Sequence, residues 1–199
     1  MMSIRILDIC GDALPQYAGI YRKIPIAFQV RSILHPELID NGLGGIKLRE
    51  EKLAVSYVKD YDVLPDDKPF FALAERNPRD WGVFLALDGN RPVGGATVSL
   101  NTAGRWMMDG RRDISVLEDI RVHPNFRRAG VGTKLIHRVA NWSRNRGCRQ
   151  LMMETQNINV NACRFYAKQG CRLGGFNRYG YGDHPQVKHE IMLIWYLDL

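Results

Sequence analysis

The stretch over residues 116–133, VLEDIRVHPNFRRAGVGT, constrains the fold of this 199-residue chain more than any other. Its first seven residues are rich in valine, leucine and isoleucine, which predicts a strand. Pro124 ends that strand because proline has no N–H to donate to a neighbouring strand and also restricts the residue before it. Gly130 and Gly132 then introduce an amphipathic run over residues 133–146, which predicts a helix. The stretch is therefore a strand, a glycine-containing turn and a helix in direct succession.

The turn has the chemistry of an anion site. Gly130 and Gly132 let the backbone come close to a ligand, and the N–H groups at a helix start have no partner within the helix. The helix dipole and the adjacent Arg127 and Arg128 favour a negative group, most naturally a phosphate. No lysine follows Gly132 as in a P-loop, and the third glycine of a dinucleotide fingerprint is not clear. Taken alone, the turn is also compatible with an ordinary strand, turn and helix that has a basic cap.

A second motif lies downstream, and the two motifs together resemble a known superfamily. Residues 159–170, NVNACRFYAKQG, have the pattern N-x-x-A-x-x-x-Y-x-x-x-G. Residues 127–132, RRAGVG, have the pattern R/Q-x-x-G-x-G/A after a strand that ends in a hydrophobic-x-Pro sequence. Over about residues 80–199 the chain resembles the GNAT superfamily of N-acetyltransferases. The resemblance implies an enzyme that moves an acetyl group from acetyl-CoA to a primary amine by direct transfer.

The predicted fold is α/β, with a GNAT-like mixed, mostly antiparallel central sheet flanked by helices. One parallel strand pair opens the acyl-CoA site. We expect a single acyltransferase domain over residues 1–199, with 1–80 as a variable, acceptor-side part and 81–199 as the acyl-CoA-binding core. Residues 1–23 are ambiguous because Pro15 interrupts the segment after a possible short strand, and residues 46–60 have mixed signals. Strands are predicted over 24–34, 81–87, 92–100, 116–122, 149–156, 171–181 and 189–197, helices over 133–146 and 159–169, and one or two helical turns over 70–76.

The resemblance also implies which residues contact the coenzyme. Asn159 has two compatible functions, as the N-cap of its helix and as a hydrogen-bond partner of the pantetheine arm. A backbone N–H of the central strand is expected to stabilise the oxyanion. The predicted coenzyme-binding residues are Ile120, Arg121, Val122, Arg127, Arg128, Ala129, Gly130, Val131, Gly132, Thr133, Asn159 and Tyr166.

Glu118, Asp119 and Tyr166 are the predicted catalytic residues. Transfer to an amine requires loss of a proton from that amine, and a carboxylate on the central strand can accept it directly or through water. Strand alternation places Glu118 and Asp119 on opposite faces, although a bulge would bring either near the site. The alternative is structural, with solvation at a strand edge or a salt bridge to Arg121. The resemblance implies that Tyr166 is the general acid for the departing thiolate, and its alternative is a half-buried packing aromatic.

The acceptor is indicated by a finer resemblance. LMMETQ over residues 151–156, with the second motif and the terminal WYL over 195–197, resembles the streptothricin acetyltransferase branch. That branch acetylates an amine on the β-lysine part of streptothricin-type antibiotics. The acidic stretch before the second strand is nearly absent here, although a polycationic substrate should prefer acidic surroundings. A smaller amine, a protein Nα or Nε amine, and a non-catalytic acyl-CoA-binding module therefore remain alternatives.

Composition limits the partners further. The net charge of +7 is dispersed along the chain, with part of it around the turn, so we expect no nucleic-acid partner. No apolar run approaches the roughly 20 residues that span a bilayer, and the N-terminus is not a signal peptide, so we expect a cytoplasmic protein without a membrane partner. His189-Glu190 lacks the second histidine of a zinc motif, and the four cysteines are scattered, so we expect no metal. The expected partners are a small-molecule amine and, through exposed sheet edges, a second copy in a homodimer.

Overall fold

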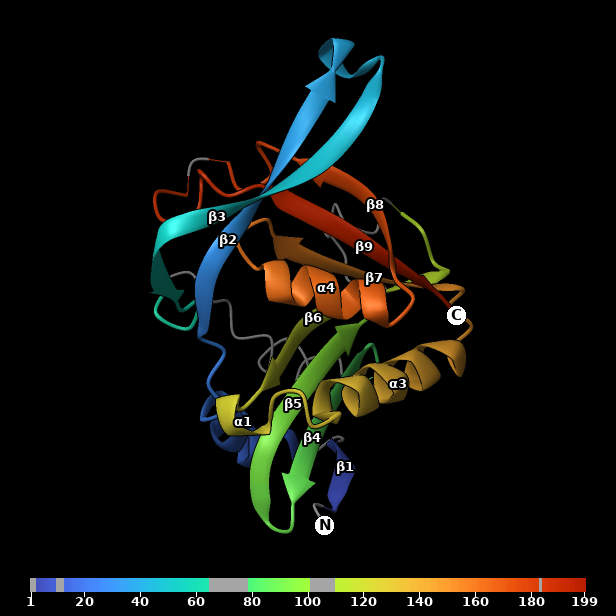
Figure 1. Cartoon of the computed structure of the whole chain (residues 1–199). Coiled ribbons are helices and arrows are strands. Elements are labelled where there is room, and N and C mark those ends of the chain that lie inside the picture. Colours follow the sequence, from blue (N-terminus) through green and yellow to red (C-terminus); the bar gives the residue numbers. More distant parts are fainter. Residues whose placement is uncertain (1–2, 10–12, 65–78, 101–109, 183) are drawn as a thin grey trace. The chain divides into compact units, whose positions relative to one another are not determined.

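The structure is a computed structural model that describes residues 3–9, 13–64, 79–100, 110–182 and 184–199 (Figure 1). The chain divides into two compact units. The first unit comprises Met1–Ile26, Asp66–Met153 and Tyr196–Leu199, and the second comprises Ala27–Pro65 and Glu154–Trp195. Our division into a coenzyme core and an acceptor-side part at residue 80 stays a prediction.

The first unit is built on a sheet whose strands lie in the order β1-β4-β5-β6-β7. The pairs β1/β4, β4/β5 and β5/β6 are antiparallel, whereas β6 and β7 run in the same direction. The parallel pairing extends from Ile114 opposite Gln150 to Leu117 opposite Met153. The predicted mixed, mostly antiparallel sheet with one parallel pair is therefore confirmed. The bounds are β1 (Ile4–Ile9), β4 (Trp81–Asp88), β5 (Arg91–Ser99), β6 (Ile114–Val122), β7 (Gln150–Gln156), α1 (Leu14–Arg22) and α3 (Val131–Arg144).

The β4–β5 hairpin supplies much of the core of this unit. Its apolar side chains are almost completely buried, with Phe84, Ala86 and Val98 at most 1% exposed. Gly89 in the connecting turn has a φ of +59°, a left-handed conformation that glycine adopts at little cost. The strands predicted over residues 81–87 and 92–100 are thus confirmed to within one residue at each end.

Helix α3 packs against β4, β5 and β6 with its apolar face. Leu135, Ile136 and Val139 on that face are fully buried. The helix comes close to the sheet at Gly82, where an added Cβ would lie 2.8 Å from Cε2 of Trp142. The predicted helix over residues 133–146 is confirmed, with its start and its end each two residues earlier.

The N-terminal residues of the first unit form a strand and a helix that the sequence left ambiguous. Pro15 was expected to interrupt this region, but it lies in the first turn of α1. That position tolerates proline because the N–H groups of a first helical turn have no partner within the helix. Leu14, Tyr21 and Ile24 are buried in a hydrophobic cluster with residues of β4, so α1 closes the core on this side.

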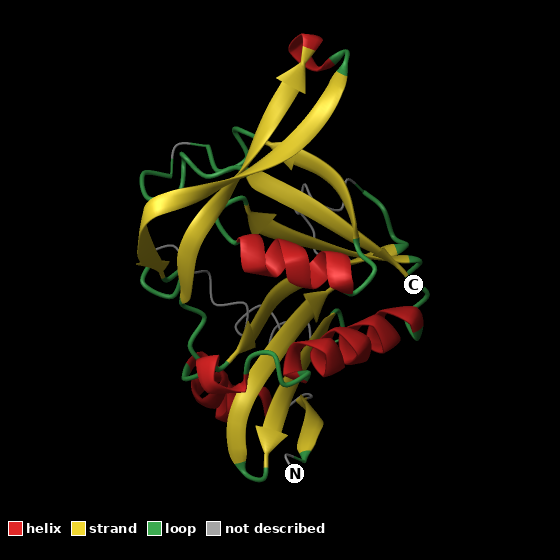
Figure 2. Cartoon of the chain, viewed as in Figure 1, coloured by secondary structure: helices red, strands yellow, loops and turns green. Residues whose placement is uncertain are grey.

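The second unit contains a separate antiparallel sheet of two long strands, together with a helix and the strands β7, β9 and β8 in that order (Figure 2). Strands β7 and β9 each run from one unit into the other. The helix predicted over residues 159–169 is confirmed, and the strand predicted over 171–181 is shorter because its last residues form turns. The bounds are β2 (Phe28–Ile39), η2 (Asp40–Gly42), β3 (Gly45–Lys59), α4 (Val160–Lys168), β8 (Arg172–Asn177) and β9 (Met192–Asp198).

Strand β3 explains the mixed signals of residues 46–60. It is 15 residues long, and all of its residues are exposed or half-buried. Alternation of apolar and polar residues arises when one face of a strand is buried, so a strand exposed on both faces lacks that pattern. The helical turns predicted over residues 70–76 lie outside the described residues. Among the helices of the described chain, none is long and apolar enough to cross a membrane.

Candidate functional site

The predicted turn between β6 and α3 is present and ends in an open helix N-terminus. Gly130 is the N-cap residue and has a φ of +82°, and Arg128 before it has a φ of +65°. No side chain of the described residues caps α3, and its first backbone bond is donated by Lys134 to the oxygen of Gly130 at 3.0 Å. The preceding N–H groups of α3 therefore have no partner within the helix and can bind an anion.

The turn is fixed to the sheet from both sides. Phe126 is 7% exposed, and the ring of His123 contacts it edge-on at 5.8 Å between centroids. Nε of Arg127 donates to the carbonyl oxygen of Val122 at 3.0 Å, and partial burial lowers the pKa of this arginine. An added Cβ at Gly94 would lie 2.9 Å from Val131, so this glycine lets the start of α3 approach β5 closely. The N–H groups at the helix start are thus held in place by packing.

Glu118 lies in a bulge of β6. Thr97 is paired with Asp119 and Val98 with Leu117, which leaves Glu118 as the extra residue on β6. The hydroxyl of Ser99, which is fully buried, donates to Oε1 of Glu118. The sequence allowed a bulge at Glu118 and Asp119, and the structure contains one. Because of the bulge, the two side chains do not simply alternate between the faces of the sheet.

Asp119 is held in a dense hydrogen-bond network. Its Oδ2 accepts from the Tyr21 hydroxyl at 2.5 Å and from Nε of Arg121 at 2.8 Å. The side chains of Asp119 and Arg121 are 9% and 4% exposed, and Nη1 of Arg121 donates to the carbonyl oxygen of Ile24 at 3.2 Å. Burial, followed by the charge of Asp119, raises the pKa of Tyr21. The sequence left a salt bridge to Arg121 as the alternative to a catalytic function. For Asp119, the structure contains this salt bridge.

Asn159 and Tyr166 belong to the second unit. Oδ1 of Asn159 accepts from the N–H of Ala162 at 3.2 Å, so its predicted N-cap function is confirmed. Tyr166 is 4% exposed, and its ring lies 5.6 Å from that of Phe165 and 6.4 Å from that of Trp195. It is more deeply buried than the half-buried aromatic considered from the sequence.

The remaining predicted coenzyme-binding residues lie along the end of β6, the turn and the first residues of α3, all in the first unit. Arg121 and Val131 are the buried members of this set, while Arg127, Arg128, Ala129 and Gly130 are exposed. The sequence did not identify Ser99 and Tyr21 as partners of the two carboxylates. No local signal could have found Tyr21, since 98 residues separate it from Asp119.

The cysteines of the described chain are poor nucleophiles. Cys148, Cys163 and Cys171 are buried and reduced. Burial raises the pKa of Cys163 to about 12 and that of Cys171 to about 11, which keeps both thiols protonated at neutral pH. Within the residues that the structure describes, no group of three or more His, Cys, Asp or Glu side chains is placed to hold a metal ion.

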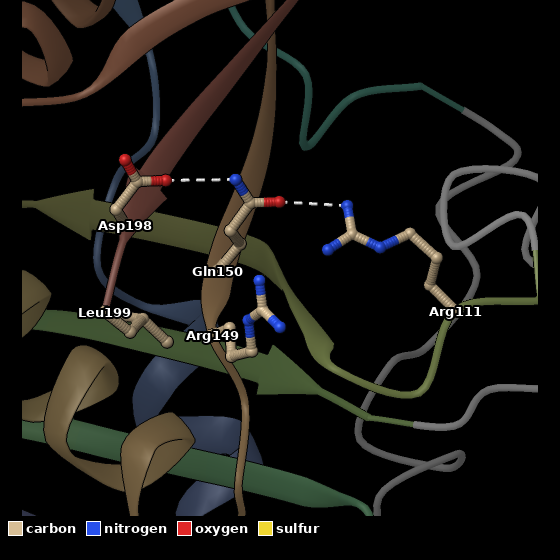
Figure 3. Close-up of a pocket in the computed structure, with 5 residues that line it drawn as sticks. All are labelled: Arg111, Arg149, Gln150, Asp198 and Leu199. Atoms are coloured by element: carbon tan, nitrogen blue, oxygen red, sulfur yellow. Dashed lines mark hydrogen bonds between the residues drawn. The ribbon is translucent and has the colours of Figure 1, made fainter.

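A pocket of about 400 Å³ lies away from the turn, at the start of the parallel strand pair (Figure 3). Arg111 donates to Oε1 of Gln150 at 2.9 Å, and Gln150 donates to Oδ1 of Asp198 at 3.0 Å. Ile114 and Gln150 form the first parallel pair, so the length of β6, roughly 26 Å, separates this pocket from the end of β6 that leads into the turn. The pocket is therefore distinct from the predicted site.

Known proteins similar to this chain belong to the superfamily that the two motifs indicated, and the matched family model includes both motifs. The model of the acetyltransferase (GNAT) family matches residues 49–171. The chain is 31% identical over 147 residues to streptothricin acetyltransferase A of Bacillus subtilis (strain 168), which covers 74% of this chain and 76% of the relative. It is 34% identical over 103 residues to a streptothricin acetyltransferase of Escherichia coli, which covers 51% of this chain and 59% of the relative.

Solved structures share the fold over nearly the whole chain. A candidate streptothricin acetyltransferase of Bacillus anthracis (strain Ames), solved in complex with acetyl coenzyme A, superposes with a TM-score of 0.74 at 26% identity and covers 99% of this chain and 100% of its own. A nourseothricin acetyltransferase superposes with a TM-score of 0.75 at 22% identity and covers 98% of both chains. Because the family model matches more than half of the chain, and because the Bacillus subtilis relative is similar over about three quarters of both sequences, the chain belongs to the GNAT family of acetyltransferases.

Proposed function

We propose that this acetyl-CoA-dependent N-acetyltransferase acetylates an amine of a streptothricin-like antibiotic. The 31% identity to streptothricin acetyltransferase A over 147 residues is the observation that carries this proposal. Modification of an antibiotic by such an enzyme would confer resistance. Because acetyl-CoA is an intracellular metabolite, we expect the reaction to take place in the cytoplasm.

The turn and the start of α3 are proposed to bind the pyrophosphate of the coenzyme. Residues 127–133 contribute backbone N–H groups at an open helix N-terminus, and Arg127 and Arg128 add positive charge. The backbone of residues 120–122 is proposed to contact the acyl end of the coenzyme and to donate to the oxyanion of the tetrahedral intermediate. Asn159 and Tyr166 are the proposed contacts from the second unit.

Glu118 is proposed to accept the proton of the attacking amine, directly or through one water. The amine must be neutral to attack the thioester carbonyl, so a nearby carboxylate promotes the reaction. Glu118 is half-buried in the bulge and oriented by Ser99, whereas both oxygens of Asp119 accept from Arg121, and Oδ2 also accepts from Tyr21. We therefore assign proton removal to Glu118 and the positioning of α1 on β6 to Asp119.

Tyr166 is proposed to protonate the leaving thiolate. The amine nitrogen bonds to the carbonyl carbon, the carbon–sulfur bond then breaks, and the sulfur takes a proton from the Tyr166 hydroxyl. Packing against Phe165 and Trp195 fixes the ring of Tyr166, so its hydroxyl has a defined position.

Thiol release from acetyl-CoA tests the proposal. The acceptor panel contains streptothricin, lysine derivatives, polyamines, aminoglycosides and short peptides. Saturable release with streptothricin is the expected result, and mass spectrometry should show one added acetyl group on the antibiotic. Saturable release with peptides alone would instead establish a protein acetyltransferase and overturn the proposed acceptor.

A homodimer is proposed through the β2–β3 hairpin. Large hydrophobic side chains are exposed along this hairpin, and clusters of that kind mark contact surfaces. They are Leu38, Ile39, Leu43, Ile46, Val55, Tyr57 and Val58. Light scattering should give twice the chain mass of 22.7 kDa, and a monomer at assay concentration would contradict the proposal.

A further inference from the structure

The second unit contains two tyrosine–glutamate pairs that lie outside the proposed coenzyme-binding residues. In the first pair, the Tyr61 hydroxyl donates to Oε2 of Glu190 at 2.6 Å. In the second pair, the Tyr181 hydroxyl donates to Oε1 of Glu154. Tyr61 follows β3, Glu154 lies on β7, and the other two residues lie between β8 and β9, so folding brings each pair together from distant parts of the sequence.

The first pair already binds an ammonium group of the protein itself. Nζ of Lys59 lies 2.6 Å from Oε1 of Glu190 and 5.0 Å from the centroid of the Tyr61 ring. It also donates to the backbone oxygen of Gln186 at 3.3 Å. The side chain of Glu190 is 0% exposed and that of Lys59 is 14% exposed, so this ion pair is part of the interior. The second unit therefore holds an alkyl ammonium with a carboxylate, the face of a phenol ring and a carbonyl.

The second pair has the same chemistry in a more accessible place. Glu154 and Tyr181 are both partly exposed, in contrast to the buried Glu190. Gln156 lies two residues further along the same face of β7, and its Nε2 donates to Oε1 of Glu154 at 3.2 Å. The parallel pairing of β7 ends at Met153, so Glu154 is the first residue beyond the paired segment.

The tyrosine hydroxyls of both pairs lie in the field of glutamate charges. Burial raises the pKa of Tyr61, and the hydrogen bond and charge of Glu190 and the charge of Glu154 raise it further. Burial likewise raises the pKa of Tyr181, and the charge of Glu154 adds to the effect. The charges of the two glutamates contribute a negative potential at the tyrosine hydroxyls, and a negative potential favours a bound cation.

We infer that Glu154, oriented by Tyr181 and Gln156, binds a second ammonium group of the acceptor. This group differs from the reacting amine, because the reacting amine has to lose its proton before it attacks. The inference rests on the proposed function and deepens it, since it defines the preferred acceptors as diamines and polyamines. It also supplies the acidic surroundings that the sequence before the second strand lacks.

Calorimetry with the full-length protein saturated with coenzyme A tests the inference without turnover. The probes are 1,5-diaminopentane and pentylamine, which have the same length and differ by one ammonium group. Wild-type protein should bind the diamine about 10-fold to 100-fold more tightly, the effect of one charge-assisted hydrogen bond. Glu154→Gln should abolish this preference. Glu51→Gln is the matched control, because it removes an exposed carboxylate of the same unit, and it should keep the preference.

Tyr181→Phe provides a second variant in case Glu154→Gln fails to fold. It keeps the ring and should reduce the preference for the diamine by a factor of about five, as expected for one neutral hydrogen bond. Equal binding of the two probes by wild-type protein would overturn the inference, as would an unchanged preference in a folded Glu154→Gln variant.

Kinetics with streptothricin separates the inference from the proposed function. Glu154→Gln should raise the KM for the antibiotic about 10-fold while kcat and the KM for acetyl-CoA change less than about threefold. If wild-type protein does not acetylate streptothricin but still prefers the diamine through Glu154, the proposed acceptor is wrong and the ammonium site stands. A Glu154→Gln variant that loses kcat and retains KM would overturn the assignment of Glu154 to binding.

Discussion

The turn over residues 127–133 of the first unit, which is the proposed coenzyme site, and the tyrosine–glutamate pairs of the second unit are built in different ways. The turn is one continuous segment, and its proposed binding groups are mainly backbone N–H groups at a helix start. The pairs consist of side chains from distant segments, since Tyr61 and Glu190 are 129 positions apart in the sequence. A phosphate can therefore be recognised by a short motif, whereas a cationic acceptor requires a completed fold. Single substitutions in the two units test this contrast.

Gly130→Asp should have the largest effect, because it places a carboxylate at the helix N-terminus where the pyrophosphate is proposed to bind. We expect the Kd for coenzyme A to rise at least about 100-fold, or about 2.8 kcal/mol. Isothermal titration calorimetry gives this value directly. Gly89→Asp is the matched control, since both glycines have positive φ and an added Cβ at either would meet no described atom within 4 Å. Similar losses of affinity in the two variants would reject the turn as the phosphate site.

Glu118→Gln should lower kcat by about 10³-fold, within the range typical of a lost general base. The Kd for coenzyme A should stay within about threefold, because the proposed phosphate contacts lie in the turn and not in the bulge. Steady-state assays of thiol release with the best acceptor measure kcat. A variant with normal kcat would remove Glu118 from the mechanism and leave Asp119 as the carboxylate to test.

Tyr166→Phe should lower kcat by about 100-fold with a small change in coenzyme affinity. The ring contacts with Phe165 and Trp195 are retained in this variant, so the fold is preserved and the hydroxyl alone is removed. A thioester with a better leaving thiol should restore part of the lost rate. Normal turnover with acetyl-CoA would show that Tyr166 is a packing residue.

Asp119→Asn should lower the stability of the fold more than it lowers kcat. The substitution leaves the buried guanidinium of Arg121 without its carboxylate partner, which costs about 3 kcal/mol. For a chain of this length, Tm should fall by roughly 6–12 °C. Calorimetric unfolding measures the loss, and kcat at 20 °C should fall far less than in Glu118→Gln. The reverse pattern, a stable protein without activity, would exchange the functions assigned to the two carboxylates.

The sequence predicted most of the first unit because its signals are local. Buried strands, a proline after β6 and glycines at the start of α3 are each visible within a few residues. The same approach left β3 undefined, because neither face of that strand is buried, and it treated Pro15 as an interruption although the first turn of a helix tolerates proline.

In the candidate site, too, the sequence predicted the local features and missed the contacts between distant segments. The motif residues 127–132 and 159–170 were identified as a pattern, and Asn159 is the N-cap that was expected. The bulge at Glu118 depends on pairing with β5, and the network around Asp119 depends on Tyr21 in α1. Sequence spacing contains no information on such contacts, so separate functions for the two carboxylates could be proposed only from the fold.

Ser99→Ala should have the smallest effect and tests whether the bulge needs a side chain to orient Glu118. Loss of one hydrogen bond to the carboxylate should lower kcat about fivefold, equivalent to about 1 kcal/mol. Ser115→Ala is the matched control, because Ser115 is a buried serine at the start of β6 that donates to Oγ of Ser143 at 2.7 Å and not to Glu118. Both variants should lose similar stability, but Ser99→Ala alone should lose kcat at unchanged coenzyme Kd. If both lose kcat equally, general loosening of β6 explains the effect, and the bulge backbone alone determines where Glu118 lies.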